Sequence, residues 1–166
     1  MGDIQIRIEN VSAVIAALEG IKKKLDPATR KATQQSGDEL RRAARSNFVG
    51  WHAPGIHHVG GDQPNRVSGD LQQSIIALTP VSPMGPAKYQ TRIGPTAIYS
   101  RVIELGAHIT PKEAKMLSWF DAEMGVRRYE KGVTIPPRPF FTPAALSLAP
   151  KMRAIFVTAW KDAIDG

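Results

Sequence analysis

The chain has no cysteine among its 166 residues. Disulfides, thiol catalysis and cysteine-containing zinc or iron–sulfur sites are therefore excluded, and the composition suits a reducing cytoplasm. The sequence also lacks an apolar run of the roughly 20 residues that a membrane helix needs, and its N-terminus lacks the apolar core of a secretory signal. We expect a soluble protein that is neither exported nor inserted in a membrane and is stabilised by packing.

Patterns typical of an enzyme are missing as well. Neither Gly60-Gly61 nor Gly94-Pro95 belongs to a glycine pattern that cradles phosphates, since no lysine follows in the manner of a P-loop. Glu104 has no second carboxylate or nucleophile at a spacing that indicates a catalytic pair, so we expect it to pair with Arg101 or Arg138. The sequence predicts a protein that is not an enzyme and has no cofactor.

Histidines form the one group that resembles a metal site. His52, His57 and His58 lie near Asp62, and imidazole and carboxylate groups bind zinc or nickel where a fold brings them together. The spacing matches no established site and the glycines of this segment disperse the side chains, which favours solvated or interface histidines over a metal centre. His108 stands alone and is interpreted as a surface or capping residue rather than a catalytic base.

Positive charge is spread along the chain rather than gathered in a tail. The net charge of +7 comes from 22 basic and 15 acidic residues, and the sequence pI is about 9.9. The densest cluster, Lys22 to Lys24, falls at the end of a predicted helix, where cations interact favourably with the helix dipole. A phosphate-binding patch is the alternative interpretation, because a basic surface favours nucleic-acid contact at low salt.

Hydrophobic periodicity predicts an α+β fold. Residues 4–8 alternate as a strand, and two helices follow, one from a cap at Asn10 to residue 25 and one from Asp26 and Pro27 to Gly50. Residues 50–69 are predicted to form a long loop. The rest of the pattern indicates strands at 71–79 and 87–94 joined by 80–86, a short helix at 97–105 ended by Gly106, and a hairpin of 116–120 with 126–135.

These elements predict one domain over residues 1–166, with a mainly antiparallel sheet packed against the two N-terminal helices, the short central helix and a C-terminal helix. Residues 1–50 supply the first strand and a helical hairpin, and residues 70–135 supply the sheet with its hairpin extension. Residues 136–166 hold a proline-rich arm and the last helix, in which Pro150 is expected to cause a kink. The inward face of that helix is predicted to consist of Met152, Ile155, Phe156, Ala159 and Ala163.

The arm IPPRPFFTPAAL, which starts at Ile135, has three prolines that fix their own φ angles and bias the preceding residues to extended geometry. Thr142 followed by Pro143 predicts a helix start, with threonine as the N-cap. The arm would thus present Phe140 and Phe141 rigidly, which suits packing or docking because few rotamers are frozen on contact. We interpret it as an assembly element.

Three strings in fixed order carry a resemblance to a known family: RVSGDLQQSI from Arg66, IYSRVIELGAHI from Ile98 and the arm from Ile135. Together they resemble the neck and tail-completion family of long-tailed bacteriophages, which includes the minor tail protein Z type of lambda-like phages. Two departures are the long histidine-bearing loop and Ala107, where a threonine often follows the glycine. The resemblance implies that Gly69 and Leu71 start a strand. Its other motif residues, none of them catalytic, are Tyr99, Glu104, Gly106, Arg138, Pro139, Phe140 and Phe141.

The resemblance further implies a structural virion protein that forms a ring, of about six copies, at the head–tail junction and is needed for head–tail joining. Implied partners are the connector or stopper, the tail terminator and the tail tube, with genomic DNA passing through the lumen and assembly occurring in the host cytoplasm. A tail terminator, a small basic nucleic-acid-binding protein and a hydrolase at the histidine loop are the alternatives. Phe140 is expected either to anchor its own subunit or to insert into the next one beside Glu104, with Arg138 pairing with that carboxylate.

Overall fold

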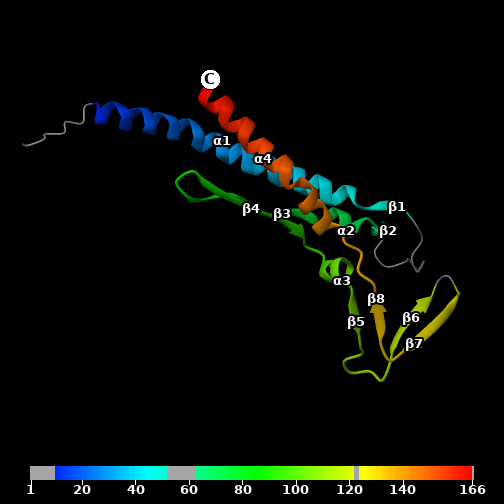
Figure 1. Ribbon diagram of the computed structural model, residues 1–166. Helices are drawn as coiled ribbons and strands as arrows, with labels where there is room; N and C mark the ends of the chain where they lie inside the picture. The colour runs from blue at the N-terminus through cyan, green and yellow to red at the C-terminus, as the bar shows by residue number, and fades with distance from the viewer. Residues whose placement is uncertain (1–9, 52–62, 122–123, 166) are drawn as a thin grey trace, which may run out of the picture.

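A computed structural model describes residues 10–51, 63–121 and 124–165 of the chain (Figure 1). It confirms the α+β class. Its helices are α1 (Val11–Ser46), α2 (Asp70–Gln73), α3 (Ser100–Leu105) and α4 (Phe141–Asp165). Its strands are β1 (Val49–Trp51), β2 (Asn65–Arg66), β3 (Ile75–Gly85), β4 (Lys88–Pro95), β5 (Ala107–Ile109), β6 (Leu117–Asp121), β7 (Val126–Glu130) and β8 (Val133–Ile135). The strand predicted at residues 4–8 lies outside the described residues, as does most of the predicted loop.

The two predicted N-terminal helices are one helix, so the predicted helical hairpin is wrong. Pro27 lies inside α1, where it removes one backbone hydrogen bond. Tertiary contacts hold this turn in place: the Tyr89 hydroxyl donates to Asp26 at 2.7 Å, and the indole N–H of Trp160 donates to the Thr29 hydroxyl at 3.0 Å. The predicted side-chain cap at Asn10 is not formed. Because α1 continues to Ser46, Lys22 to Lys24 do not lie at a helix end and the predicted dipole interaction is also wrong.

The strands form four separate two-stranded ladders within the described residues, three antiparallel and one parallel, instead of one sheet. β3 and β4 make the longest ladder, and all but the last residue of the segment 80–86, which was predicted to join them, belongs to β3. Its pairing shifts register between Ala77 and Thr79, between Thr79 and Ser82 and between Pro83 and Gly85. Prolines at positions 80 and 83 lack the N–H that a regular ladder needs, which explains the irregular pairing.

The predicted hairpin is confirmed between β6 and β7, but its second arm stops at Glu130 rather than at Ile135. Residues 133–135 form β8, which pairs with β5 instead. The break falls at Gly132, where an added Cβ would lie 2.7 Å from the His108 ring, so the chain passes β5 closely there. The β6–β7 hairpin thus becomes a separate projection at one end of the molecule, away from the free end of α1 (Figure 1).

A small core joins these parts. Phe48, Ile75 and Phe140 pack with Ala44 and Ala144, so that α1, β3, the arm and α4 share one cluster. The rings of Phe48 and Phe140 lie 5.0 Å apart between centroids in a tilted arrangement. In α4, the five residues predicted to face inward are all at least partly buried, which confirms that face, and Pro150 lies inside the helix.

Candidate functional site

The proline arm and the short helix α3 form one structural unit. β8 leads into the arm and pairs with β5 in the register Ala107 to Ile135. Three residues after Ile135, the Arg138 N–H donates to the carbonyl of Ile103 at 2.7 Å. The arm therefore runs back along α3 to the start of α4 within the same chain, which brings the second and third sequence motifs into contact.

Gly106 allows this close approach. Its φ is 72°, a left-handed conformation that glycine adopts readily, and an added Cβ would lie 2.8 Å from the Ile135 carbonyl oxygen and 2.9 Å from the Pro137 nitrogen. Any side chain here would push the arm away from α3. The predicted end of the central helix at Gly106 is confirmed, although the helix begins at Ser100 instead of residue 97.

Glu104 holds the first turn of α4 from outside that helix. Its Oε2 accepts hydrogen bonds from the N–H groups of Phe140 at 2.8 Å and Phe141 at 3.0 Å, and its Oε1 accepts one from the N–H of Thr142 at 2.8 Å. These N–H groups have no partner within the helix, and the positive end of the helix dipole favours an anion. The predicted pairing of Glu104 with an arginine is therefore replaced by a helix cap. Thr142, predicted to be the cap, lies inside α4.

The pKa of Glu104 reflects the same geometry. Partial burial acts to raise it, but the hydrogen bonds from Phe141, Phe140 and Thr142 together outweigh burial and hold the pKa of Glu104 below its ordinary value. The carboxylate is thus charged at neutral pH and engaged by the backbone. In this state it acts as a structural anion.

Phe140 anchors its own subunit. Its side chain is fully buried against Phe48, and its carbonyl accepts a hydrogen bond from the Asn47 amide at 2.7 Å. Phe141 is partly buried and packs against the same core, and Pro139 is also partly buried. Of the two expected roles for Phe140, the structure shows the one within the subunit.

The first motif also lies at the place where α3, the arm and the start of α4 meet, which we call the junction, but it does not have the predicted structure. Gly69 and Leu71 do not start a strand: Gly69, at φ 85°, precedes α2, Leu71 lies in α2, and β3 begins only at Ile75. Backbone bonds from Gln73 to Gly69 and from Ser74 to Asp70 close this short helix. Arg45 of α1 then fastens the start of β3 by donating to the carbonyls of Gln73 and Ile75.

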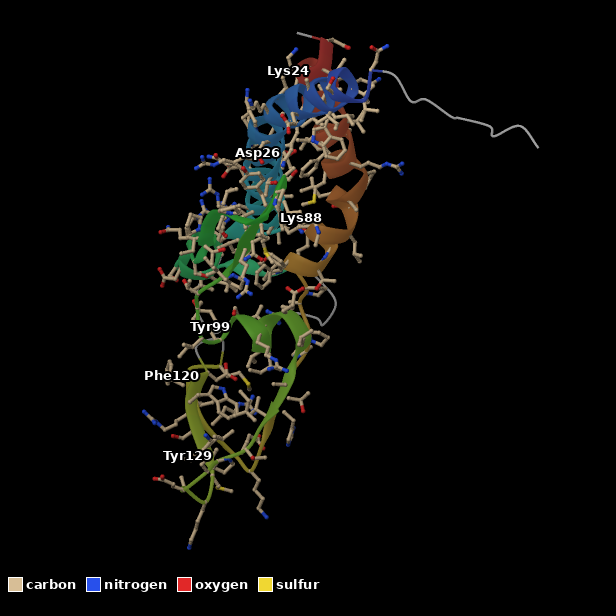
Figure 2. All side chains as sticks on the ribbon, turned by 90° about the vertical axis from the view of Figure 1, so that its left-hand side faces the viewer. Lys24, Asp26, Lys88, Tyr99, Phe120 and Tyr129 are labelled. Carbon is tan, nitrogen blue, oxygen red and sulfur yellow. The ribbon has the colours of Figure 1, made fainter. Side chains whose placement is uncertain are left out.

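All three motifs line one cavity of about 220 Å³. Gly69 and Leu71 come from the first motif, Tyr99 and Ile103 from the second, and Arg138 from the arm. Phe48 and Arg66 also line it, and the Arg66 guanidinium lies 5.2 Å from the centre of the Trp51 ring in a cation–π contact. Figure 2 shows Tyr99 between the helical part of the molecule and the β6–β7 hairpin.

A second kind of surface lies away from this junction. On the first half of α1, every residue from 11 to 24 is exposed, and the large apolar ones recur every three or four positions on one face: Val11, Val14, Ile15, Leu18 and Ile21. The β6–β7 hairpin exposes Phe120, Met124, Val126 and Tyr129. These two surfaces lie at opposite ends of the molecule, with Lys24 near one end and Phe120 and Tyr129 at the other in Figure 2.

Sequence reasoning missed several contacts that build the site. Two of these are the contact of Arg66 with Trp51 and the hydrogen bond from the Asn47 side chain to the Phe140 carbonyl. Each joins residues far apart in the chain, and no sequence pattern indicates that they lie close together in space. The sequence showed the helical spacing of the apolar residues in the first half of α1, but it did not show that these side chains are exposed in the folded subunit. His108 is exposed and lies within hydrogen-bonding distance of the Thr134 hydroxyl, 2.9 Å from it, which confirms a surface position.

The predicted histidine group, His52, His57, His58 and Asp62, lies outside the described residues. Within the described residues, no cluster of three or more metal-ligating side chains is present. Nor does any helix in this part of the chain have the length and apolar character needed to cross a membrane. Comparisons with protein-family models, with curated proteins and with solved structures found no match for this chain.

Proposed function

We propose that this chain is a structural, non-enzymatic subunit of a homo-oligomeric ring at the head–tail junction of a tailed bacteriophage. The observation that carries the assembly part of the proposal is the pair of apolar surfaces at opposite ends of the molecule. Among the described residues, twenty-four large hydrophobic side chains are exposed and seven hydrophobic residues are buried. Large exposed apolar patches are typical of protein–protein contact sites.

The placement of these surfaces favours a ring over a two-fold dimer. A contact between two different surfaces is heterologous, and repeating it either closes a ring or extends a filament. The first half of α1 and the β6–β7 hairpin differ in structure and lie far apart in the fold, so a contact that either of them makes with another part of a second copy is heterologous (Figure 1). The virion setting is supported by the three ordered motifs, which resemble the neck and tail-completion family and meet at one junction in this fold.

In this proposal the subunit assembles in the host cytoplasm, and about six copies complete the neck between the connector or stopper and the tail. Genomic DNA passes through the lumen without sequence-specific binding. The basic side chains then face acidic neighbouring proteins, because a strongly positive lumen would retain DNA through its phosphates.

The test is removal of the protein from the phage that encodes it, followed by electron microscopy of lysates. We expect filled heads and complete tails of normal length that do not join, and antibody label at the junction of wild-type particles. Tails of uncontrolled length would instead identify a tail terminator. Label elsewhere in the particle, or normal joining without the protein, would refute the proposal. Binding to DNA that weakens steeply with salt would favour the nucleic-acid-binding alternative.

A further inference from the structure

The apolar stripe on the first half of α1, residues Val11, Val14, Ile15, Leu18 and Ile21, continues a face that is already an interface within the subunit. Further along α1, positions 29, 32 and 36 are buried, and α4 packs on this part of the helix. Leu18, Leu25 and Ala32 follow one another at intervals of seven residues, the repeat of a helix–helix seam. The seam thus runs from Val11 to Ser36, and α4 covers only its later part.

Among the described residues, the uncovered part has no helix beside it in its own subunit. Trp160 of α4 donates to Thr29 of α1, and α4 ends five residues after Trp160, so the first turns of α1 extend beyond it (Figure 1). The projecting turns continue a helix that is already nucleated by its packed part, but they gain no tertiary packing of their own, which is the main source of helix stability in proteins.

A matching groove lies between α1 and α4 of the same chain. Its volume is about 590 Å³, and its walls are mostly small or apolar side chains, including Ala28, Ile155, Ala159 and Ala163. It runs along α4 from Lys151 to Ala163, roughly 18 Å at the rise of an α-helix, whereas the stripe from Val11 to Ile21 spans roughly 15 Å. Large side chains on the stripe and small ones in the groove are the combination in which one helix seats closely between two others.

Charges at the two surfaces also match. Glu19 and Lys22 lie beside the stripe, and Lys31 and Asp162 line the groove, one on each helix. Within the described residues, none of these four side chains forms a salt bridge, so all are available to pair across an interface. Such exposed pairs contribute orientation more than affinity.

From this we infer that the projecting first half of α1 of one copy inserts into the groove between α1 and α4 of a second copy. The inference rests on the proposed homo-oligomeric ring and names the surfaces that form it. Stripe and groove are different parts of one chain, so the contact is heterologous, and each copy both gives a helix and receives one.

The natural absence of cysteine makes a crosslinking test direct. We would prepare Leu18→Cys and Ala159→Cys as separate variants, one of them enlarged by a tag, and mix them under mild oxidation. Within one copy these positions lie roughly 16 Å apart along α1, since Leu18 is eleven residues from the Thr29 contact, whereas a disulfide needs Cα atoms within about 7 Å. We expect a disulfide-linked heterodimer of the two variants. Leu146→Cys, on an exposed site outside both surfaces, replaces Leu18→Cys as the control and should give none.

A second variant checks the same contact without crosslinks. Leu18→Glu places a charge in the stripe, and we expect association to weaken by at least about tenfold in light scattering, with the far-UV spectrum unchanged. Leu146→Glu is the matched control and should associate like the wild type. Crosslinks of Leu18→Cys only with itself, unchanged association of Leu18→Glu, or a wild-type chain that stays at 18.1 kDa at its highest soluble concentration would each overturn the inference.

The two proposals fail separately. If the protein is absent from the head–tail junction while the Leu18 and Ala159 variants still crosslink, the virion proposal fails and the helix insertion stands. If phage carrying Leu18→Glu join heads to tails normally and no crosslink forms, the insertion fails and the virion proposal stands.

Discussion

The junction of α3, the arm and α4 contrasts with the two projecting ends of the molecule. At the junction, Phe140 is buried, Glu104 accepts three backbone hydrogen bonds and Gly106 lets two segments cross closely. At the ends, the first half of α1 and the β6–β7 hairpin expose apolar side chains of similar size. Apolar side chains thus stabilise the fold at the junction and are exposed for contacts at the two ends. Substitutions at the junction should therefore reduce stability, whereas substitutions at the ends should reduce assembly and leave stability nearly unchanged.

Phe140→Ala gives the largest expected loss of stability. Removing a fully buried phenylalanine leaves a cavity beside Phe48 and costs about 3–5 kcal/mol, enough to unfold a marginally stable domain. Chemical denaturation followed by circular dichroism measures the loss. Phe120→Ala, at a ring that is 60% exposed, is the control and should unfold like the wild type. Equal stability of the two variants would contradict the assignment of Phe140 to the core.

Glu104→Gln should destabilise the protein less than Phe140→Ala does and should show a distinct pH dependence. The variant loses the charge that faces the first turn of α4, which we expect to cost about 1–2 kcal/mol at neutral pH. Because the pKa of Glu104 is lowered in the folded state from its ordinary value of 4.5, its contribution is present above that value and is lost as the pH falls through the lowered pKa.

The free energies of unfolding of the wild type and of Glu104→Gln should therefore become more similar as the pH is lowered. Above about pH 5 the wild type is the more stable protein, and the difference narrows as the pH is reduced below 4.5. Denaturation at several pH values checks this. A difference that stays constant down to pH values well below 4.5 would mean that the charge of Glu104 contributes nothing to capping α4.

Gly106→Ala should destabilise the protein by about 1–3 kcal/mol, because its backbone is left-handed and the new methyl group would meet the Ile135 carbonyl. Gly20→Ala is the matched control. Gly20 lies in the projecting part of α1 with no atom within 4 Å of an added Cβ, so alanine there should leave stability unchanged or raise it by up to about 1 kcal/mol. A melting temperature that falls for Gly106→Ala and does not fall for Gly20→Ala would distinguish the crowded junction from the open projection. Equal shifts of the melting temperature would contradict this difference.

Sequence patterns predicted the local elements well where the pattern lies in one segment. The period of the α4 residues, the turn after β6 and the glycine after α3 each depend on neighbours within a few positions. Predictions failed where distant contacts decide the outcome. Pro27 indicates a helix start, but contacts from Tyr89 and Trp160 hold its turn helical. The strand predicted from Leu71 failed for a different reason, because local hydrogen bonds within residues 69–74 close a short helix before β3 begins.

The sequence indicated which residues form the candidate site, but it did not indicate which contacts they make. The motif containing Glu104 and Gly106 was singled out together with the arm, and the two do meet. The role of Glu104 could not be read from the sequence, because an arginine and a row of backbone N–H groups are both suitable partners for a carboxylate, and only the fold decides between them. The fully buried position of Phe140 likewise depends on Phe48, ninety-two residues earlier in the chain.

The smallest expected effect on stability is at the β6–β7 hairpin, and it should accompany a large effect on assembly. Phe120 and Tyr129 are both exposed near the end of the molecule opposite the α1 projection, so Phe120→Ser together with Tyr129→Ser should change the free energy of unfolding by less than about 0.5 kcal/mol. If this hairpin contacts a neighbouring protein in the neck, phage carrying both changes should contain folded subunits but join heads to tails poorly, as counted by electron microscopy. Normal joining would remove the hairpin from the assembly surface and leave α1 as the projection that carries the contacts.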